Sequence, residues 1–443
     1  MNPDKIFIYT LLFAFATLGE TDCLGVPLYD NLGYKVVQID QDQTYDYMDL
    51  THEGVYAEHL KSLEVGMMGS PLSPPYIALS SSDSFEISFD DLHGGYENYI
   101  YRILHCTHDW EISDLTTSEY LRGFNDQLIN DVEQSFNTRQ SYTHYRFSFP
   151  NDMCRPILSG NYIVQIFQED DLERPLIIKR LVVYETLTGI RMKIKESTVV
   201  SERRYKQEVD FDIVKIDYPI YDAYDDMHVV VMQNHRWDNA IFGLQPTFNK
   251  GNEFVYDYSN ENNFDGLNEF RWFDTKSLRY AALGTDSVRE RVDGWHHYLT
   301  PQPKRTYDVY RTQGDINGRY LLRNDDFDTD VESQYIWVHF SLATEKLSDA
   351  DEIFIFGELT QWDYLDEAKM QWNSARRCYE GKLYLKQGYY NYGYSVRYKG
   401  NPQGTMRELE GSHSVTRNSY TVIVYYADGR GYDRVIGMAV GEA

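Results

Sequence analysis

The chain has 443 residues, which is enough for about two to four domains that each bury a core. Its 69 acidic and 42 basic side chains give a formal net charge of −27, and such a surface disfavours binding to nucleic acid or to an anionic membrane. The abundance of Tyr, 39 residues against 13 Pro and 12 His, indicates a predominantly β fold.

Residues 1–23 have the features of a secretory signal peptide. An apolar run at residues 6–18 follows Lys5 and is too short to span a bilayer comfortably. We therefore expect export from the cytoplasm, and no later apolar segment is long enough for a transmembrane helix. Cys23 follows the polar residues 20–22, where a lipidation site would have small and aliphatic side chains, so the sequence disfavours a lipid anchor.

The first domain is expected at residues 24–187. Residues 34–40 read as a strand, and residues 41–57 as an acidic link. Beyond this link, short apolar runs are separated by Ser, Asp and Gly, a pattern typical of an immunoglobulin-like β-sandwich. The expected strands are residues 77–79, 85–89, 99–106, 142–149, 162–167 and 176–184.

The strand at residues 99–106 has a period-two pattern of β-forming side chains and ends at Asp109 and Trp110. The polar passage that follows reads as a long connection laid over the sandwich. Single apolar side chains are expected to anchor it: Trp110, Leu115, Tyr120 and Phe124.

The strand at residues 142–149 predicts one core face and one solvent face. The expected core side chains are Tyr145, Phe147 and Phe149. The expected solvent-facing side chains are His144, Arg146 and Ser148.

Two further β-sandwich domains are expected, at residues 188–303 and 304–443, with a linker at residues 302–305. Residues 227–232 are so apolar that we expect a central strand covered on both faces. The other strands expected in the second domain are residues 190–195, 208–214 and 268–273. Those expected in the third are residues 335–342, 353–359, 381–385, 390–398 and 420–426.

An ordered set of short motifs gives a family resemblance over nearly the whole chain. The motifs are residues 73–79, 85–92, 96–115, 118–124, 135–138, 142–145, 149–151, 159–162, 233–237, 268–274 and 385–392. In this order and spacing they resemble the type IX secretion system plug protein. The third domain is similar to early-set immunoglobulin-like modules of the glycogen-binding kind at residues 356–362.

The resemblance implies a non-enzymatic periplasmic protein of tandem immunoglobulin-like and early-set β-sandwiches. Such a protein binds and closes the periplasmic opening of the large outer-membrane β-barrel translocon of type IX secretion. It implies no cofactor, no small-molecule ligand, no direct membrane span and no nucleic-acid partner. It transfers no contact residues, so no catalytic, cofactor, metal or binding residue is assigned.

The residues themselves offer little chemistry. His105, Cys106 and His108 crowd together, but neighbouring positions of a strand point to opposite faces and no second ligand pair is present, so we expect no zinc site. Asp90 and Asp91, and the acidic residues 325–330, lack the Gly and closing Glu of the known calcium loop and read as solvated loops. The nucleophile-elbow, zinc-protease and phosphate-loop motifs are missing, so we expect no enzyme.

Cys106 and Cys154 both fall in the first domain. In an oxidising envelope they could form a disulfide, but buried free thiols are common in such strand and loop contexts. The sequence leaves both states open.

The aromatic residues of the third domain support an alternative function, a secreted or surface glycan-binding protein. A sugar-stacking platform could be formed by Trp362, Trp372, Tyr389, Tyr390 and Tyr392. Alternation at spacing two is, however, what a half-buried strand presents, and it favours core packing of these rings.

Overall fold

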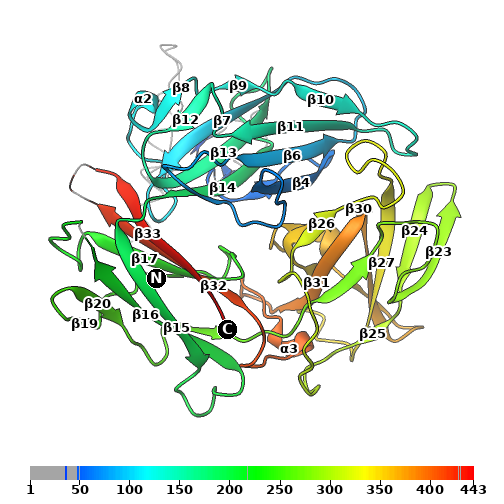
Figure 1. Cartoon of the computed structure of the whole chain (residues 1–443). Coiled ribbons are helices and arrows are strands. Elements are labelled where there is room, and N and C mark those ends of the chain that lie inside the picture. The colour runs from blue at the N-terminus through cyan, green and yellow to red at the C-terminus, as the bar shows by residue number, and fades with distance from the viewer. Residues whose placement is uncertain (1–34, 37–46, 49, 217, 428, 430) are drawn as a thin grey trace, which may run out of the picture. The chain divides into compact units, whose positions relative to one another are not determined.

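The computed structural model describes residues 35–36, 47–48, 50–216, 218–427, 429 and 431–443, and most of its regular elements are β-strands (Figure 1). The expected all-β class of tandem sandwiches is confirmed. Strands β1 (Lys35–Val36) and β2 (Tyr47–Met48) pair in an N-terminal unit that ends at Leu50. The expected signal peptide, including Cys23, lies outside the described residues.

The first sandwich is built from two mainly antiparallel sheets. One has the order β10 (Asp131–Gln134), β11 (Thr143–Phe149), β6 (Phe85–Asp91), β4 (Leu60–Met67). The other has the order β3 (Gly54–Val55), β14 (Ile177–Tyr184), β13 (Gly160–Gln168), β7 (Tyr99–Cys106), β9 (Gln127–Leu128), with β5 (Tyr76–Ala78) parallel to β14. A short helix α2 (Thr117–Tyr120) leads to β8 (Leu121–Gly123), which pairs with β12 (Cys154–Pro156).

Alternation along the strands fills the first core. Phe85 and Phe89 of β6 are fully buried there, as are Tyr145 and Phe149 of β11. Phe147 packs against the same core, so the core face expected for residues 142–149 is confirmed. Burying an aromatic side chain of this size stabilises the fold by roughly 1.5–3 kcal/mol.

The second sandwich also has two sheets. One has the order β15 (Thr188–Glu196), β16 (Lys206–Lys215), β20 (Glu253–Tyr256), β19 (Phe248–Asn249), with β21 (Asn263–Asp265) beside β16. The other has the order β18 (Ile241–Phe242), β17 (Met227–Gln233), β32 (Ser419–Ala427), β33 (Asp433–Glu442). Strand β17 is central and almost wholly buried, as expected for residues 227–232.

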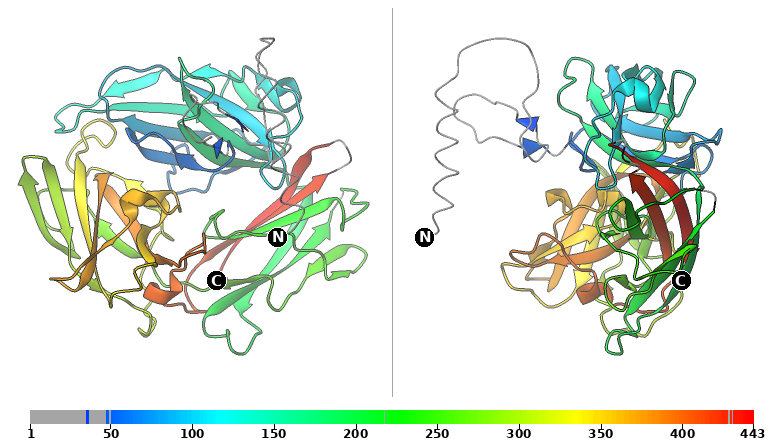
Figure 2. Two further views of the ribbon diagram at one scale, coloured as in Figure 1. Left: turned by 180° about the vertical axis from the view of Figure 1, so that it is seen from behind. Right: turned by 90° about the vertical axis from the view of Figure 1, so that its left-hand side faces the viewer.

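Strand pairing corrects the assignment of residues 420–426. They belong to β32, which pairs with β17 from Met227↔Tyr426 to Gln233↔Tyr420, so they complete the second sandwich and not the third (Figure 2, red beside green). Residues 268–273, expected in the second sandwich, belong to the third, because β22 (Arg271–Asp274) pairs with β31 (Gly388–Arg397) of the third sandwich. The third sandwich is therefore inserted into the second.

The third sandwich packs two sheets around Phe273, Phe340, Tyr390 and Tyr392. In one sheet β31 pairs with β22, β26 (Tyr320–Leu322) and β28 (Glu352–Phe356). The other has the order β23 (Thr285–Arg291), β24 (Gly294–Leu299), β27 (Tyr335–Ala343), β30 (Cys378–Lys386), β29 (Gln371–Asn373), with β25 (Gln302–Pro303) beside β27.

Helices are few and short in the third sandwich. They are the 3-10 turns η1 (Glu358–Thr360) and η2 (Asp366–Ala368) and the single-turn α3 (Arg407–Glu410). Among the described residues, no helix has the length and apolar character needed to cross a bilayer.

Candidate functional site

The junction between the first and third sandwiches contains a buried ion pair. Asp90 Oδ2 on β6 lies 2.8 Å from Lys386 Nζ on β30, and both side chains are at most 1% exposed. The Tyr335 hydroxyl donates to the same oxygen at 2.7 Å, and His144 Nδ1 lies 2.7 Å from Asp90 Oδ1. Burial alone would raise the pKa of Asp90, but Lys386 and His144 outweigh it and hold that pKa below its ordinary value. A charged carboxylate thus joins the two sandwiches.

Two sequence expectations are wrong at this junction. The sequence places Asp90 and Asp91 in a solvated loop and His144 on a solvent-facing side of its strand. The structure places both aspartates at the end of β6 with no exposed surface, and His144 is also buried. The third sandwich covers Asp90 and His144, and the Tyr99 hydroxyl donates to Asp91 at 2.9 Å. Alternation cannot distinguish a polar side chain buried by pairing from a solvated one.

Glu64 on β4 belongs to the same junction. Its Oε1 accepts the backbone N–H of Leu322 at 3.0 Å, and the nearby Tyr320 hydroxyl donates to the carbonyl of Leu63. Burial raises the pKa of Glu64 to about 7. This carboxyl therefore changes its charge near neutral pH inside a contact between two sandwiches.

The junction between the first and second sandwiches is aromatic. Trp110 packs edge to face against Trp237, with ring centroids 4.7 Å apart, and the Arg180 guanidinium lies 4.5 Å from the Trp110 ring centroid. Trp110 is buried, but in this junction and not in the first core. Of the other expected anchors, Tyr120 packs in the first core, whereas Phe124 is 68% exposed and does not act as an anchor.

His108 lies in the same junction and joins Asp433 of the second sandwich. Its Nδ1 is 2.8 Å from Asp433 Oδ2, and its ring stacks on that of His228 with centroids 3.7 Å apart. Although burial opposes it, the hydrogen bond with Asp433 raises the pKa of His108. Burial and the neighbouring His108 lower the pKa of His228.

The structure does not bring His105, Cys106 and His108 together as metal ligands. His105 Nδ1 instead lies 3.0 Å from Ser113 Oγ, and burial lowers the His105 pKa to about 4. His108 is held by Asp433, as described above.

Three other groups in the described part of the chain place three potential ligand atoms within 4.8 Å of one another. They are His59, Asp91 and His93; His108, His228 and Asp433; and Glu208, Asp210 and Asp257. In the first two groups the histidine rings stack nearly parallel, so their ring nitrogens do not point toward one centre, as a bound metal requires. In the third group, Lys195 pairs with Glu208 and Asp210.

Among the acidic residues 325–330, Asp325, Asp326 and Asp330 form ion pairs. Asp325 lies 2.8 Å from Arg323, and Asp326 lies 3.3 Å from Arg279. Asp330 Oδ2 lies 3.1 Å from Arg146 Nη1 of the first sandwich. This segment therefore contributes to the junction between the first and third sandwiches.

The cysteines of the first sandwich are separate thiols. Cys106 and Cys154 are both free and fully buried, and Cys154 belongs to the first core. Burial raises the pKa of the Cys154 thiol to about 11. Of the two states that the sequence leaves open, the structure has the buried free thiols.

The motif at residues 233–237 lies where all three sandwiches meet. Asn234 and His235 both adopt positive φ angles, 54° and 59°, and the Asn234 amide bonds Asn418 at 2.8 Å. The Arg236 guanidinium then lies 4.2 Å from the ring centroid of Trp362 in the third sandwich. A cavity of about 200 Å³ at this point is lined by residues of all three sandwiches. The motif thus aligns the sandwiches with one another.

The expected sugar platform is not formed. Tyr390 and Tyr392 lie in the third core, and Trp372 packs against that core. Trp362 is covered by Arg236, and Tyr389 stacks on Trp272 with centroids 5.7 Å apart. The core packing that alternation predicts is confirmed for Tyr390 and Tyr392.

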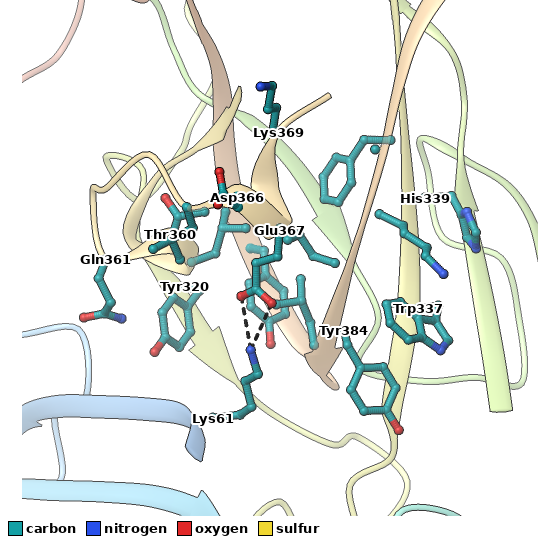
Figure 3. Close-up of a pocket in the computed structure, with 18 of the residues that line it drawn as sticks. Lys61, Tyr320, Trp337, His339, Thr360, Gln361, Asp366, Glu367, Lys369 and Tyr384 are labelled. Carbon is teal, nitrogen blue, oxygen red and sulfur yellow. Dashed lines mark hydrogen bonds and ion pairs between the residues drawn. The ribbon is translucent and has the colours of Figure 1, made fainter. Parts of the chain in front are cut away.

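A cleft of about 1590 Å³ opens between the first and third sandwiches. Lys61 of β4 reaches across it to Glu367, with Nζ 3.1 Å from the carboxylate, as the dashed lines in Figure 3 show. Trp337 and Tyr384 lie side by side along the third sandwich, with ring centroids 4.7 Å apart (Figure 3). Nothing in the sequence singles out this pair, although alternation over residues 335–342 places Tyr335, Trp337 and His339 on one strand face.

The family model for the first domain of the type 9 secretion system plug protein matches residues 60–185, from the start of β4 to the end of the first sandwich. The chain belongs to the type IX secretion system plug protein family. Its structure is similar to the crystal structure of a hypothetical protein from Parabacteroides merdae, with a TM-score of 0.85 and 32% sequence identity over 89% of this chain and 100% of that chain. A search of curated proteins found no match.

The matched plug domain contains several residues through which the first sandwich meets its neighbours. Asp90 and His144 contact the third sandwich, and His108 and Trp110 contact the second. The family relationship associates the chain with the type IX secretion machinery. Within this plug family member, the residues described above act as structural contacts between sandwiches.

Proposed function

We propose that this chain is a non-enzymatic periplasmic plug, exported by its signal peptide, that binds and closes the periplasmic opening of the type IX outer-membrane translocon barrel. The observation that carries the proposal is the match of the first sandwich to the plug family. A plug acts by occupying space, so it needs a body that does not deform under load. Buried polar contacts between the sandwiches, such as Asp90 with Lys386, support this role.

The surface is compatible with a partner that exists both free and bound. A plug that must detach has to remain soluble when free, and a formal net charge of −27 favours solubility. A reversible contact of this kind is expected to be polar and hydrated.

Deleting the gene tests the proposal. The deletion should make the outer membrane permeable to large antibiotics when the translocon is present, and a second deletion that removes the translocon should abolish the leak. Restoring the plug gene should restore the barrier. Equal permeability with and without the plug, or copurification of the protein with a surface glycan system instead of the barrel, would contradict the proposal.

A glycan-binding role for the third sandwich is the second candidate. Because Tyr390 and Tyr392 are buried, it would depend on the cleft pair Trp337 and Tyr384. Sugar stacking needs an open ring face, whereas Lys382 Nζ lies 4.0 Å from the ring centroid of Trp337. We therefore favour the plug role over glycan binding.

A further inference from the structure

The outer face of the sheet that contains β23, β24, β27 and β30 combines aromatic and basic side chains. We call it the aromatic–basic face and define it by Arg289, Arg291, Tyr298, Trp337, Lys382 and Tyr384. Register brings these residues together, because Trp337 pairs with Tyr384 while His339 pairs with both Tyr298 and Lys382. Four of its residues line one side of the cleft between the first and third sandwiches, namely Tyr298, Trp337, Lys382 and Tyr384.

The cations of this face lie over its rings. Lys382 Nζ is 4.0 Å from the Trp337 ring centroid, and the guanidinium carbons of Arg289 and Arg291 are 5.4 and 5.6 Å from that of Tyr298. The Tyr298 ring also stacks on that of His339, with centroids 4.2 Å apart. The rings are half-buried, and the three cations are exposed. The cations therefore present their charge to solvent above an apolar base.

The charge of this face is opposite to that of the chain. Basic side chains elsewhere commonly pair with carboxylates, as Arg146 does with Asp131 and Arg434 with Glu185. Within the described residues, no carboxylate forms an ion pair with Arg289, Arg291 or Lys382.

The carboxylates near these cations are already occupied. Glu290 pairs with Arg139 at 2.6 Å, Glu380 with Arg376, and Asp293 Oδ1 lies 3.0 Å from His296 Nε2.

His339 lies among these cations. Burial lowers the pKa of His339 to about 4, and the charges of Lys382 and Arg291 act in the same direction, whereas the Asp293 carboxylate opposes them. A cationic patch on a chain with a formal net charge of −27 attracts a negatively charged partner and orients it toward this side of the molecule.

We propose that the aromatic–basic face is the docking surface for an acidic, carboxylate-bearing segment of a protein partner. The identity of that partner rests on the proposed function, under which it is the translocon. Trp, Tyr and Arg are the side chains that most often dominate binding energy at protein interfaces. Carboxylates of the partner would pair with Arg289, Arg291 and Lys382, and its apolar groups would cover Trp337 and Tyr384.

A polysaccharide fits this face less well. Sugar rings stack on a flat aromatic surface, and here Lys382 lies over Trp337 while the Tyr298 ring contacts His339 and the two arginines. An acidic peptide segment needs no open ring face, because its carboxylates bind the cations directly.

The test is a charge reversal in the full chain, Arg289→Glu with Arg291→Glu and Lys382→Glu. The matched control, Lys193→Glu with Arg203→Glu and Arg204→Glu, changes the charge equally at exposed positions of the second sandwich. Binding to the purified, detergent-solubilised translocon is measured at about 50 and 300 mM salt, on either side of physiological ionic strength. Thermal unfolding verifies that both variants fold.

We expect the triple reversal to weaken binding about 10-fold or more at low salt and to flatten the salt dependence, while the control stays near wild type. Trp337→Ala should weaken binding without changing the salt dependence. If wild type binds the translocon and the reversal binds with equal affinity, the face is not the docking surface, although the proposed function stands. If wild type itself does not bind, both ideas fail.

A second experiment tests whether the partner is a polysaccharide and not a protein. Wild type and the triple reversal are titrated with polygalacturonate, an anionic polysaccharide. Binding by wild type that the reversal loses, with translocon binding unchanged, would overturn the assignment to a protein partner. No binding of polygalacturonate, together with weakened translocon binding in the reversal, is the expected result.

Discussion

Replacing Lys386 by Met tests whether the buried ion pair holds the first and third sandwiches together. The substitution keeps most of the side-chain volume but removes the ammonium group that lies 2.8 Å from Asp90 Oδ2 and donates at the same distance to the Asp330 carbonyl. Asp90 then remains buried with only His144 and Tyr335 as partners. Removing one member of a buried pair costs about 3–5 kcal/mol, because the remaining charge is uncompensated. We expect Lys386→Met to lower the free energy of unfolding by that amount at pH 7.

The loss of unfolding free energy in Lys386→Met should be larger at pH 7 than at pH 5. In the wild type the Asp90 pKa lies below its ordinary value, so the pair contributes stability above the unfolded pKa of about 3.9 and loses it as the pH falls through the folded value. In the variant, Lys386 no longer opposes the effect of burial, so the pKa of Asp90 rises and the carboxylate takes up a proton more readily. The difference in free energy of unfolding between wild type and variant should therefore become smaller as the pH is lowered from 7 to 5.

Urea unfolding followed by tryptophan fluorescence and circular dichroism measures this effect. Lys193→Met, at an exposed lysine, is the matched control and should stay within about 0.5 kcal/mol of wild type. The double variant Asp90→Asn with Lys386→Met should recover much of the loss, since a neutral pair leaves no buried charge. A cost below about 1 kcal/mol for Lys386→Met, or a difference that does not change with pH, would refute the reasoning.

Three more predictions concern other sites. Because burial raises the pKa of Glu64 to about 7, the free energy of unfolding of the wild type should fall as the pH rises from about 4.5 to 7. Glu64→Gln should remove this fall and raise the free energy of unfolding by about 1–2 kcal/mol at pH 8. If the variant keeps the wild-type pH profile, Glu64 is not the source of the fall. Trp110→Ala should lower the free energy of unfolding by about 3–5 kcal/mol, whereas Phe124→Ala, at an exposed ring, should change it little. If Trp110→Ala unfolds at the same temperature as wild type, the packing of Trp110 does not stabilise the fold. The full chain should bind no member of a broad glycan panel, and a reproducible micromolar ligand lost in Trp337→Ala and Tyr384→Ala would reverse that prediction.

Local patterning is enough to find most strands of this chain, since one face of each sheet packs in a core. Residues 99–106 alternate and form β7, and residues 142–149 alternate and contain the whole of β11. Alternation also places Tyr145 and Phe149 in the first core, where they lie. These features depend on side chains close in sequence, which is why a single chain predicts them.

The contacts between sandwiches could not be predicted in the same way. Nothing in residues 420–426 indicates that their partner is β17, almost 200 positions earlier, because any sheet with a free edge accepts an alternating apolar strand. Asp90 and His144 read as solvated polar residues until the sandwiches meet. The family resemblance indicated the tandem architecture, but it transferred neither the junction residues nor the aromatic–basic face.

The insertion of the third sandwich into the second constrains the order in which the chain can fold. The second core requires Val422, Val424 and Tyr426, which the chain delivers only after the whole third sandwich. As the chain emerges from its N-terminal end, the first and third sandwiches can therefore be completed before the second, in which β17 still lacks its neighbour β32. Chaperone capture during this interval should map to Val229 and Val231, whose cross-strand neighbours Val424 and Val422 arrive only with β32.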